Sequence, residues 1–207
     1  MSLATGTLSY LRFLAETVPA AFEVPFCDAM HEQRFRDIDP DGDLEQARGW
    51  VAWDDVFAAE FDPAALVSPS GHLLLRMRID TLKVPAVTLK AYTEQAGRER
   101  ARAANRDRLT KRELDALKLE VKKRLRKRSL AKLQLIEADW NVQTGEVRLL
   151  STSKATATAF VELFEKTFAL KLMPVGLRNV LWLRGFQQEE LDRLDALEPE
   201  RFHLIPA

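Results

Sequence analysis

The stretch LLLRMRID, at residues 73–80, decides the fold class of this 207-residue chain. Every second residue belongs to one apolar face, formed by Leu73, Leu75, Met77 and Ile79. Arg76 and Arg78 lie on the other face. A period of two with one apolar face is typical of a half-buried antiparallel strand. The pattern predicts a strand over residues 73–83, from which Arg76 and Arg78 project together towards solvent or a ligand.

Two helical patterns follow this strand. Pro85 suits a first helical turn and predicts a helix over residues 85–104. Thr110 and Glu113 have the spacing of a capping box, which predicts a second helix ending near residue 128. The apolar residues of the second helix recur at spacings of three and four: Leu114, Leu117, Val121 and Leu125. We expect residues 85–130 to form an inserted two-helix hairpin with an apolar seam and a basic outside.

Positive charge is concentrated in this hairpin. Residues 98–132 hold 15 Lys and Arg against 5 Asp and Glu, a net charge of +10, although the whole chain has 31 of each sign. The rest of the chain therefore carries −10. Such asymmetry bears on binding partners rather than on the fold. A polyanion is the first candidate partner.

The flanking segments complete an α+β pattern. On the N-terminal side we expect a strand at residues 7–14, a short helix at 25–35, an acidic loop at 36–48 and an extended segment at 49–57, with Trp50 and Trp53 in the core. On the C-terminal side we expect a hairpin of strands at 133–142 and 146–151, then a helix that begins at Ser153. A strand at 170–175 and a helix at 188–197 follow, whereas 177–183 fits either. These elements predict one α+β unit over residues 1–207, with a mainly antiparallel sheet and packed helices.

Bulk features favour a cytoplasmic protein. The single cysteine, Cys27, excludes an internal disulfide framework and is predicted to be a small buried apolar residue. The first residues lack the pattern of a signal peptide. No apolar run reaches the roughly 20 residues that span a bilayer, so no membrane partner is expected.

Signatures of an active site are weak. Asp37, Asp39, Asp41 and Asp43 alternate, but the twelfth position of an EF-hand counted from Asp37 is Arg48, so we expect a solvated acidic loop. The histidines His31, His72 and His203 lack ligand spacing, and no glycine-rich phosphate loop occurs. We predict no metal, no cofactor and no catalytic residue.

One pair of carboxylates leaves an alternative open. Glu137 and Asp139 share a strand face, which is the arrangement of the first two carboxylates in a metal-dependent nuclease. The same face could equally be a solvated sheet surface.

The order of these elements resembles the recombination-associated protein RdgC family. The resemblance spans residues 5–180 and includes the motif Gly49-Trp50-Val51. Four further segments carry it: LLLRMRIDTLKVPAVTLKAYTEQA at 73–96, RDRLTKRELDALKLEVKKRLRKRSLAKLQ at 106–134, IEADWNVQTGEVRLLSTSKATATAFVELFEKTF at 136–168 and LMPVGL at 172–177. The resemblance implies DNA binding without sequence specificity by a homodimer that forms a ring with a positively charged hole. It also implies a nucleoid location and antagonism of the RecA recombinase, while some members are described as exonucleases.

The chain departs from the family pattern in two ways. Family members are commonly longer, so this sequence reads as a short form that lacks much of the C-terminal part. The family places a phenylalanine near the end of the second hairpin helix, where this chain has Leu130. Ring closure and the contact made by that phenylalanine are therefore not expected to carry over unchanged.

The sequence predicts a nonspecific interface with duplex DNA. Its residues are expected to be Arg76, Arg78, Arg98, Arg102, Arg106, Arg108, Lys111, Lys118, Lys122, Lys123, Arg124, Arg126, Lys127, Arg128 and Lys132. The alternative is a protein-interaction module whose basic hairpin binds an acidic partner or the acidic remainder of a second copy.

Overall fold

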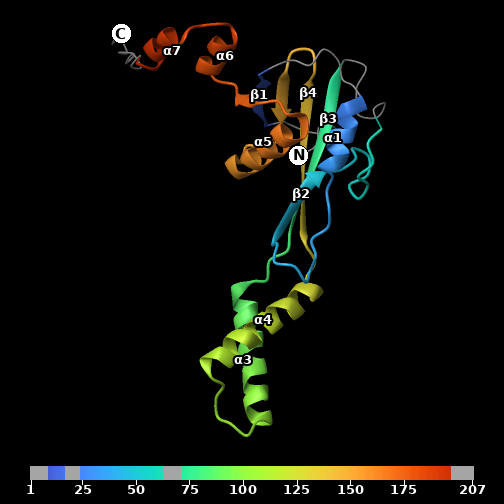
Figure 1. Ribbon diagram of the computed structural model, residues 1–207, viewed down its shortest axis with the longest axis vertical. Helices are drawn as coiled ribbons and strands as arrows, with labels where there is room; N and C mark the ends of the chain where they lie inside the picture. The colour runs from blue at the N-terminus through green and yellow to red at the C-terminus, as the bar shows by residue number, and fades with distance from the viewer. Residues whose placement is uncertain (1–8, 17–23, 63–70, 197–207) are drawn as a thin grey trace, which may run out of the picture. The chain divides into compact units, whose positions relative to one another are not determined.

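The computed structural model describes residues 9–16, 24–62 and 71–196. Its elements follow in the order β1 (Leu11–Ala15), α1 (Val24–Glu32), β2 (Gln46–Trp50), β3 (His72–Thr81), α3 (Ala86–Ala103), α4 (Lys111–Arg128), β4 (Lys132–Asn141), β5 (Glu146–Leu149), α5 (Lys154–Phe168), β6 (Leu172–Pro174), α6 (Leu177–Leu183) and α7 (Gln188–Asp195) (Figure 1). This pattern confirms the α+β class. The predicted residues 7, 8 and 197, and His203, lie outside the described residues.

The strands form one sheet in the order β2-β3-β4-β5-β1-β6. Antiparallel pairing joins β2 to β3, β4 to β5, β5 to β1 and β1 to β6. The register places Leu11 opposite Leu149 and Trp140 opposite Val147. The predicted alternation in β3 is confirmed, because its apolar residues are buried: Leu73, Leu75, Met77 and Ile79.

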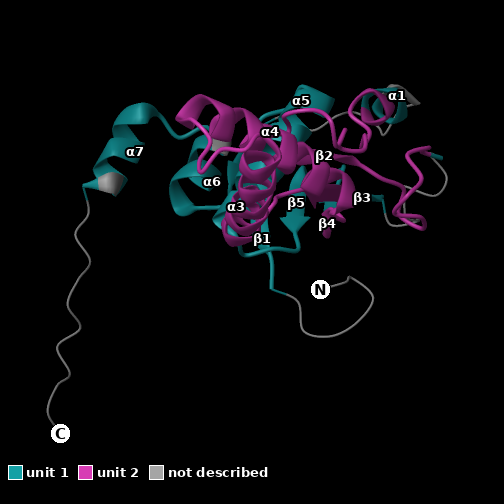
Figure 2. Cartoon of the chain, turned by 90° about the horizontal axis from the view of Figure 1, so that it is seen from below, with its two compact units in different colours: residues 1–29, 62–75, 137–207 teal, residues 30–61, 76–136 magenta. Residues whose placement is uncertain are grey.

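Contacts divide the described chain into two compact units (Figure 2). Unit 1 comprises residues 1–29, 62–75 and 137–207, and unit 2 comprises residues 30–61 and 76–136. The division falls within β3 and β4, so both strands contribute residues to each unit. That the whole chain is one domain stays a prediction.

The core of unit 1 is aromatic and lies under α5. Ser153 caps this helix by accepting a bond from the backbone N–H of Thr156, as predicted. Positions one helical turn apart then place Phe160, Phe164 and Phe168 on one buried stripe. The rings of Trp140 and Phe164 are 5.0 Å apart in an edge-to-face arrangement, which is a favourable geometry for aromatic pairs. This packing fixes α5 on the sheet.

Helices α3 and α4 of unit 2 form the predicted hairpin (Figure 1). The capping box at Thr110 and Glu113 is present. Leu117, Val121 and Leu125 are buried with Val84, which confirms most of the apolar seam. Leu114 differs from the prediction, since it is 42% exposed and lines a cavity of about 270 Å³ between the helices.

The two tryptophans expected in the core have different environments. Trp50 is fully buried, as predicted. Trp53 is only half-buried, and its ring lies beneath the Arg76 guanidinium. Cys27 is buried as predicted, and burial raises the pKa of its thiol.

Candidate nucleic-acid interface

Most of the 15 bases in residues 98–132 are exposed. Ten of them have exposed side chains with no ion-pair or hydrogen-bond partner in the part of the chain that the structure describes: Arg98, Arg102, Arg108, Lys111, Arg112, Lys118, Lys123, Arg124, Arg128 and Lys132. All except Arg112 belong to the predicted interface. Because no acid of the described ranges pairs with these bases, they are available to an external anion. We call these ten residues the basic surface.

Two arginines of the hairpin pair with acids of the hairpin itself. Arg100 lies 3.1 Å from Glu120, and Arg106 lies 2.9 Å from Glu113. The backbone N–H of Thr110, the Arg106 guanidinium and the Thr110 hydroxyl all donate to Glu113, and they lower the pKa of Glu113 to about 2. These contacts join the inter-helix segment to the first turn of α4, so Arg106 supports the hairpin fold.

The C-terminal end of α4 contacts an acidic loop at residues 37–45 (DIDPDGDLE). The buried guanidinium of Arg126 donates to the carbonyls of Leu44 at 2.7 Å, Pro40 at 3.1 Å and Asp39 at 3.3 Å. The prediction of a solvent-facing Arg126 is therefore wrong, because three carbonyl acceptors surround its side chain. The predicted solvated character of the acidic loop is confirmed for its aspartates, since Asp37, Asp39, Asp41 and Asp43 are all exposed.

Two lysines of α4 pair with carboxylates of the same loop. Lys122 lies 2.9 Å from Glu45, and Lys127 lies 2.8 Å from Asp41. The hydrogen bond and charge of Lys122 lower the pKa of Glu45. Lys122 and Lys127 remain partly exposed, as the predicted basic outside of the hairpin requires, but each is paired with a carboxylate of the loop.

The strand arginines of unit 2 are held by protein groups. Arg78 is buried and makes two bonds to Asp80, of 2.9 and 2.6 Å, with its guanidinium 4.1 Å from the centre of the Phe35 ring. The bonds to Asp80 raise the pKa of Arg78. The predicted projection of Arg78 towards solvent is therefore wrong. Arg76 is half-buried over Trp53 and donates to the Trp53 carbonyl.

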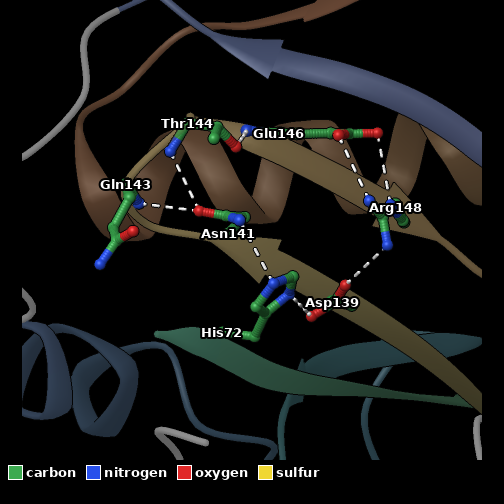
Figure 3. Close-up of polar contacts among 7 residues, drawn as sticks. All are labelled: His72, Asp139, Asn141, Gln143, Thr144, Glu146 and Arg148. Carbon is green, nitrogen blue, oxygen red and sulfur yellow. Dashed lines mark hydrogen bonds and ion pairs between the residues drawn. The ribbon is translucent and has the colours of Figure 1, made fainter. Parts of the chain in front are cut away.

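A polar network in unit 1 surrounds one of the two candidate nuclease carboxylates (Figure 3). His72 Nδ1 lies 2.7 Å from Asp139 Oδ1, and Asn141 Nδ2 lies 3.2 Å from His72 Nε2. Asn141 Oδ1 accepts bonds of 3.0 Å from the backbone N–H groups of Gln143 and Thr144. The turn thereby fixes the orientation of the Asn141 amide, which in turn fixes the His72 ring.

Arg148 extends this network on the far side of Asp139 (Figure 3). Its guanidinium lies 3.7 Å from Asp139 and 3.3 Å from Glu146. The bonds from Arg148 and Arg12 lower the pKa of Glu146. Asp139 is therefore engaged by a histidine and an arginine, an arrangement that holds β3, β4 and β5 together.

The Glu137 and Asp139 face is not a solvated surface, because Glu137 is 6% exposed and Asp139 is 8% exposed. Within the described ranges, no three His, Cys, Asp or Glu side chains form a group that could hold a metal ion. Sequence reasoning missed the role of His72. Its position at the start of β3 gave no signal, because its partners lie 67 and 69 residues away.

The described helices include none that combines the length and apolar character needed to cross a bilayer. In comparisons with known proteins, no protein-family model and no curated protein matches this chain.

Proposed function

We propose that this chain binds duplex DNA without sequence specificity through the basic surface, which lies on α3, α4, the segment between them and the start of β4. The observation that supports the proposal is the set of ten exposed bases that have no partner among residues 9–16, 24–62 and 71–196. Nonspecific binding requires cations that neutralise phosphates, and it requires no contacts to base edges. The resemblance to the RdgC family extends the proposal to a homodimer that modulates recombination by competing with the RecA recombinase.

The geometry of α4 suits this role. Its 18 helical residues span roughly 27 Å at 1.5 Å per residue. The capping box fixes its first turn, and Leu117, Val121 and Leu125 hold it against α3. The bases therefore project from a helix that is ordered before DNA binds, which lowers the entropy lost on association.

Charge reversal on α4 tests the proposal. The variant Lys118→Glu, Lys123→Glu, Arg124→Glu, Arg128→Glu changes only members of the basic surface. The matched control reverses four exposed bases of unit 1 that have no side-chain partner among the described residues: Lys154, Lys166, Arg184 and Arg193. Anisotropy of a labelled duplex should show at least a roughly tenfold loss of affinity for the α4 variant at about 0.1 M salt, and a much smaller loss for the control. Equal losses would contradict an interface on α4.

One observation favours a second candidate, an acidic protein partner. Two apolar cavities, of about 270 and 390 Å³, lie beside the exposed Leu114. Their linings include four bases, Lys90, Arg98, Arg108 and Lys118, and two acids, Glu94 and Asp107. An amphipathic helix would place its apolar face in such a groove, and the excess of four bases over two acids around it favours a helix with acidic flanks. Light scattering after size exclusion measures the mass of the protein with and without DNA. An oligomer that dissociates in salt and whose mass does not change when DNA is added would favour binding to the acidic part of a second copy.

A further inference from the structure

The acidic loop is an ordered part of unit 2. It contains five carboxylates and no base in residues 37–45. The Asp41 N–H donates to the Asp39 carboxylate at 2.9 Å, and the Gly42 N–H donates to the Asp39 carbonyl at 3.1 Å. The Glu45 carbonyl accepts from the Leu82 N–H at 2.8 Å, next to the paired strands β2 and β3. The loop therefore presents its carboxylates in defined positions.

Its contacts with α4 are of two kinds. Arg126 is only 3% exposed, and its guanidinium donates to three loop carbonyls. This contact is therefore shielded from solvent. The ion pairs are much more exposed. Side-chain exposure is 39% and 41% for Lys122 and Glu45, and 55% and 59% for Lys127 and Asp41.

These two kinds of contact respond differently to an added polyanion. Exposed ion pairs are weak and are screened by salt, so a phosphate can replace a carboxylate as the partner of the lysine. The carbonyl bonds of Arg126 involve no carboxylate and are shielded from bulk solvent. A polyanion would therefore exchange with Glu45 and Asp41 while Arg126 keeps the loop attached.

We propose that the acidic loop is an intramolecular competitor of DNA phosphates at the C-terminal end of α4. Glu45 occupies Lys122 and Asp41 occupies Lys127 until the DNA backbone displaces them. This inference rests on the proposed DNA binding and adds a regulatory element to the same surface. DNA phosphates would first contact the unpaired bases, such as Lys118 and Lys123. The acidic loop would lower the affinity for DNA, because its carboxylates must be displaced.

Neutral variants of the loop test the inference. Glu45→Gln and Asp41→Asn each remove one competing carboxylate. Asp43→Asn is the matched control, because Asp43 lies in the same loop, is exposed, and has no ion-pair or hydrogen-bond partner among the described residues. All three substitutions remove one negative charge, so each raises the affinity for DNA by the same amount through net charge alone. The measurement is the affinity for a labelled duplex over a series of salt concentrations.

Glu45→Gln and Asp41→Asn should each bind about two- to fivefold more tightly than Asp43→Asn at low salt. Each should also steepen the salt dependence by up to about 0.9, because a lysine that its carboxylate holds for part of the time in the wild type then neutralises a phosphate throughout. Equal affinities and slopes for all three variants, with the wild type binding DNA, would overturn the inference but not the proposed function. Absence of binding by every protein at low salt would overturn both.

Discussion

The guanidinium of Arg126 donates to the carbonyl of Leu44 across 2.7 Å and joins α4 to a loop 82 residues earlier in the chain. Arg126, one of the bases predicted to contact DNA, is thus held by the protein backbone and has a structural role. We predict that Arg126→Ala lowers the free energy of unfolding by about 1–3 kcal/mol, because three carbonyls lose a charged donor. Urea denaturation measures this change. Arg124→Ala, on the same helix but exposed, should change it by less than about 0.5 kcal/mol, and equal effects would contradict the assignment.

Glu113 makes the stability of the protein depend on pH. Its pKa is about 2 in the folded protein against an ordinary value of 4.5. A carboxyl group with a lowered pKa adds stability above its unfolded pKa, and that stability is lost as the pH falls through the folded pKa. The difference in stability between wild type and Glu113→Gln should therefore be full at neutral pH and shrink between about pH 4.5 and 2. Urea denaturation at several pH values measures it, and a difference that does not change with pH would contradict the capping role.

Alanine substitutions at two glycines of unit 2 should change the free energy of unfolding in opposite directions. A Cβ at Gly49 would lie 2.6 Å from the carbonyl carbon of Arg34 and would also meet the backbone of Phe35. Those atoms belong to the bridge between the segment after α1 and Trp50, so they cannot move without breaking it. Gly49→Ala should cost at least about 2 kcal/mol.

Gly97→Ala is the matched comparison, since Gly97 lies within α3 and its nearest new contact is the Leu117 side chain at 4.0 Å. Alanine there should stabilise the protein by about 0.5–1 kcal/mol through helix propensity. Thermal unfolding of both variants checks the pair. A destabilised Gly97→Ala variant, or a neutral Gly49→Ala variant, would contradict the packing described above.

The hydrogen bonds of His72 select one tautomer of its neutral ring. A carboxylate only accepts hydrogen bonds, so Nδ1 carries the proton that is shared with Asp139. Asn141 presents its NH₂ group to Nε2, because its oxygen is used by two backbone N–H groups. Nitrogen NMR should therefore show a protonated Nδ1 and an unprotonated Nε2, with the exposed His31 as a reference. A proton on Nε2 would contradict the network.

Local patterns in the sequence predicted most of the fold. The alternation from Leu73 to Ile79 and the capping box at Thr110 and Glu113 were confirmed, because each depends on residues a few positions apart. The helix predicted to begin at Ser153 is also present, and its Phe160, Phe164 and Phe168 lie on one buried stripe because they are four residues apart.

Long-range partners could not be predicted in this way. Arg126 lies on the polar side of α4 by its spacing, yet carbonyls 82 to 87 residues away surround its side chain. Arg78 shows an intermediate case. Asp80, two residues later on the same strand face, was a visible signal for an ion pair, whereas the contact with the Phe35 ring was not. The acidic composition of residues 37–45 was also visible, but its contact with α4 depends on the tertiary fold.

The salt dependence of duplex binding tests the central claim most directly. If six to eight members of the basic surface neutralise phosphates, the logarithm of the binding constant should fall with the logarithm of salt concentration at a slope of about −5 to −7. Reversing Lys118, Lys123, Arg124 and Arg128 to Glu should reduce that slope by about 3 to 4, whereas the unit 1 control should retain it. A slope near zero for the wild type, or an unchanged slope for the α4 variant, would contradict the proposed interface.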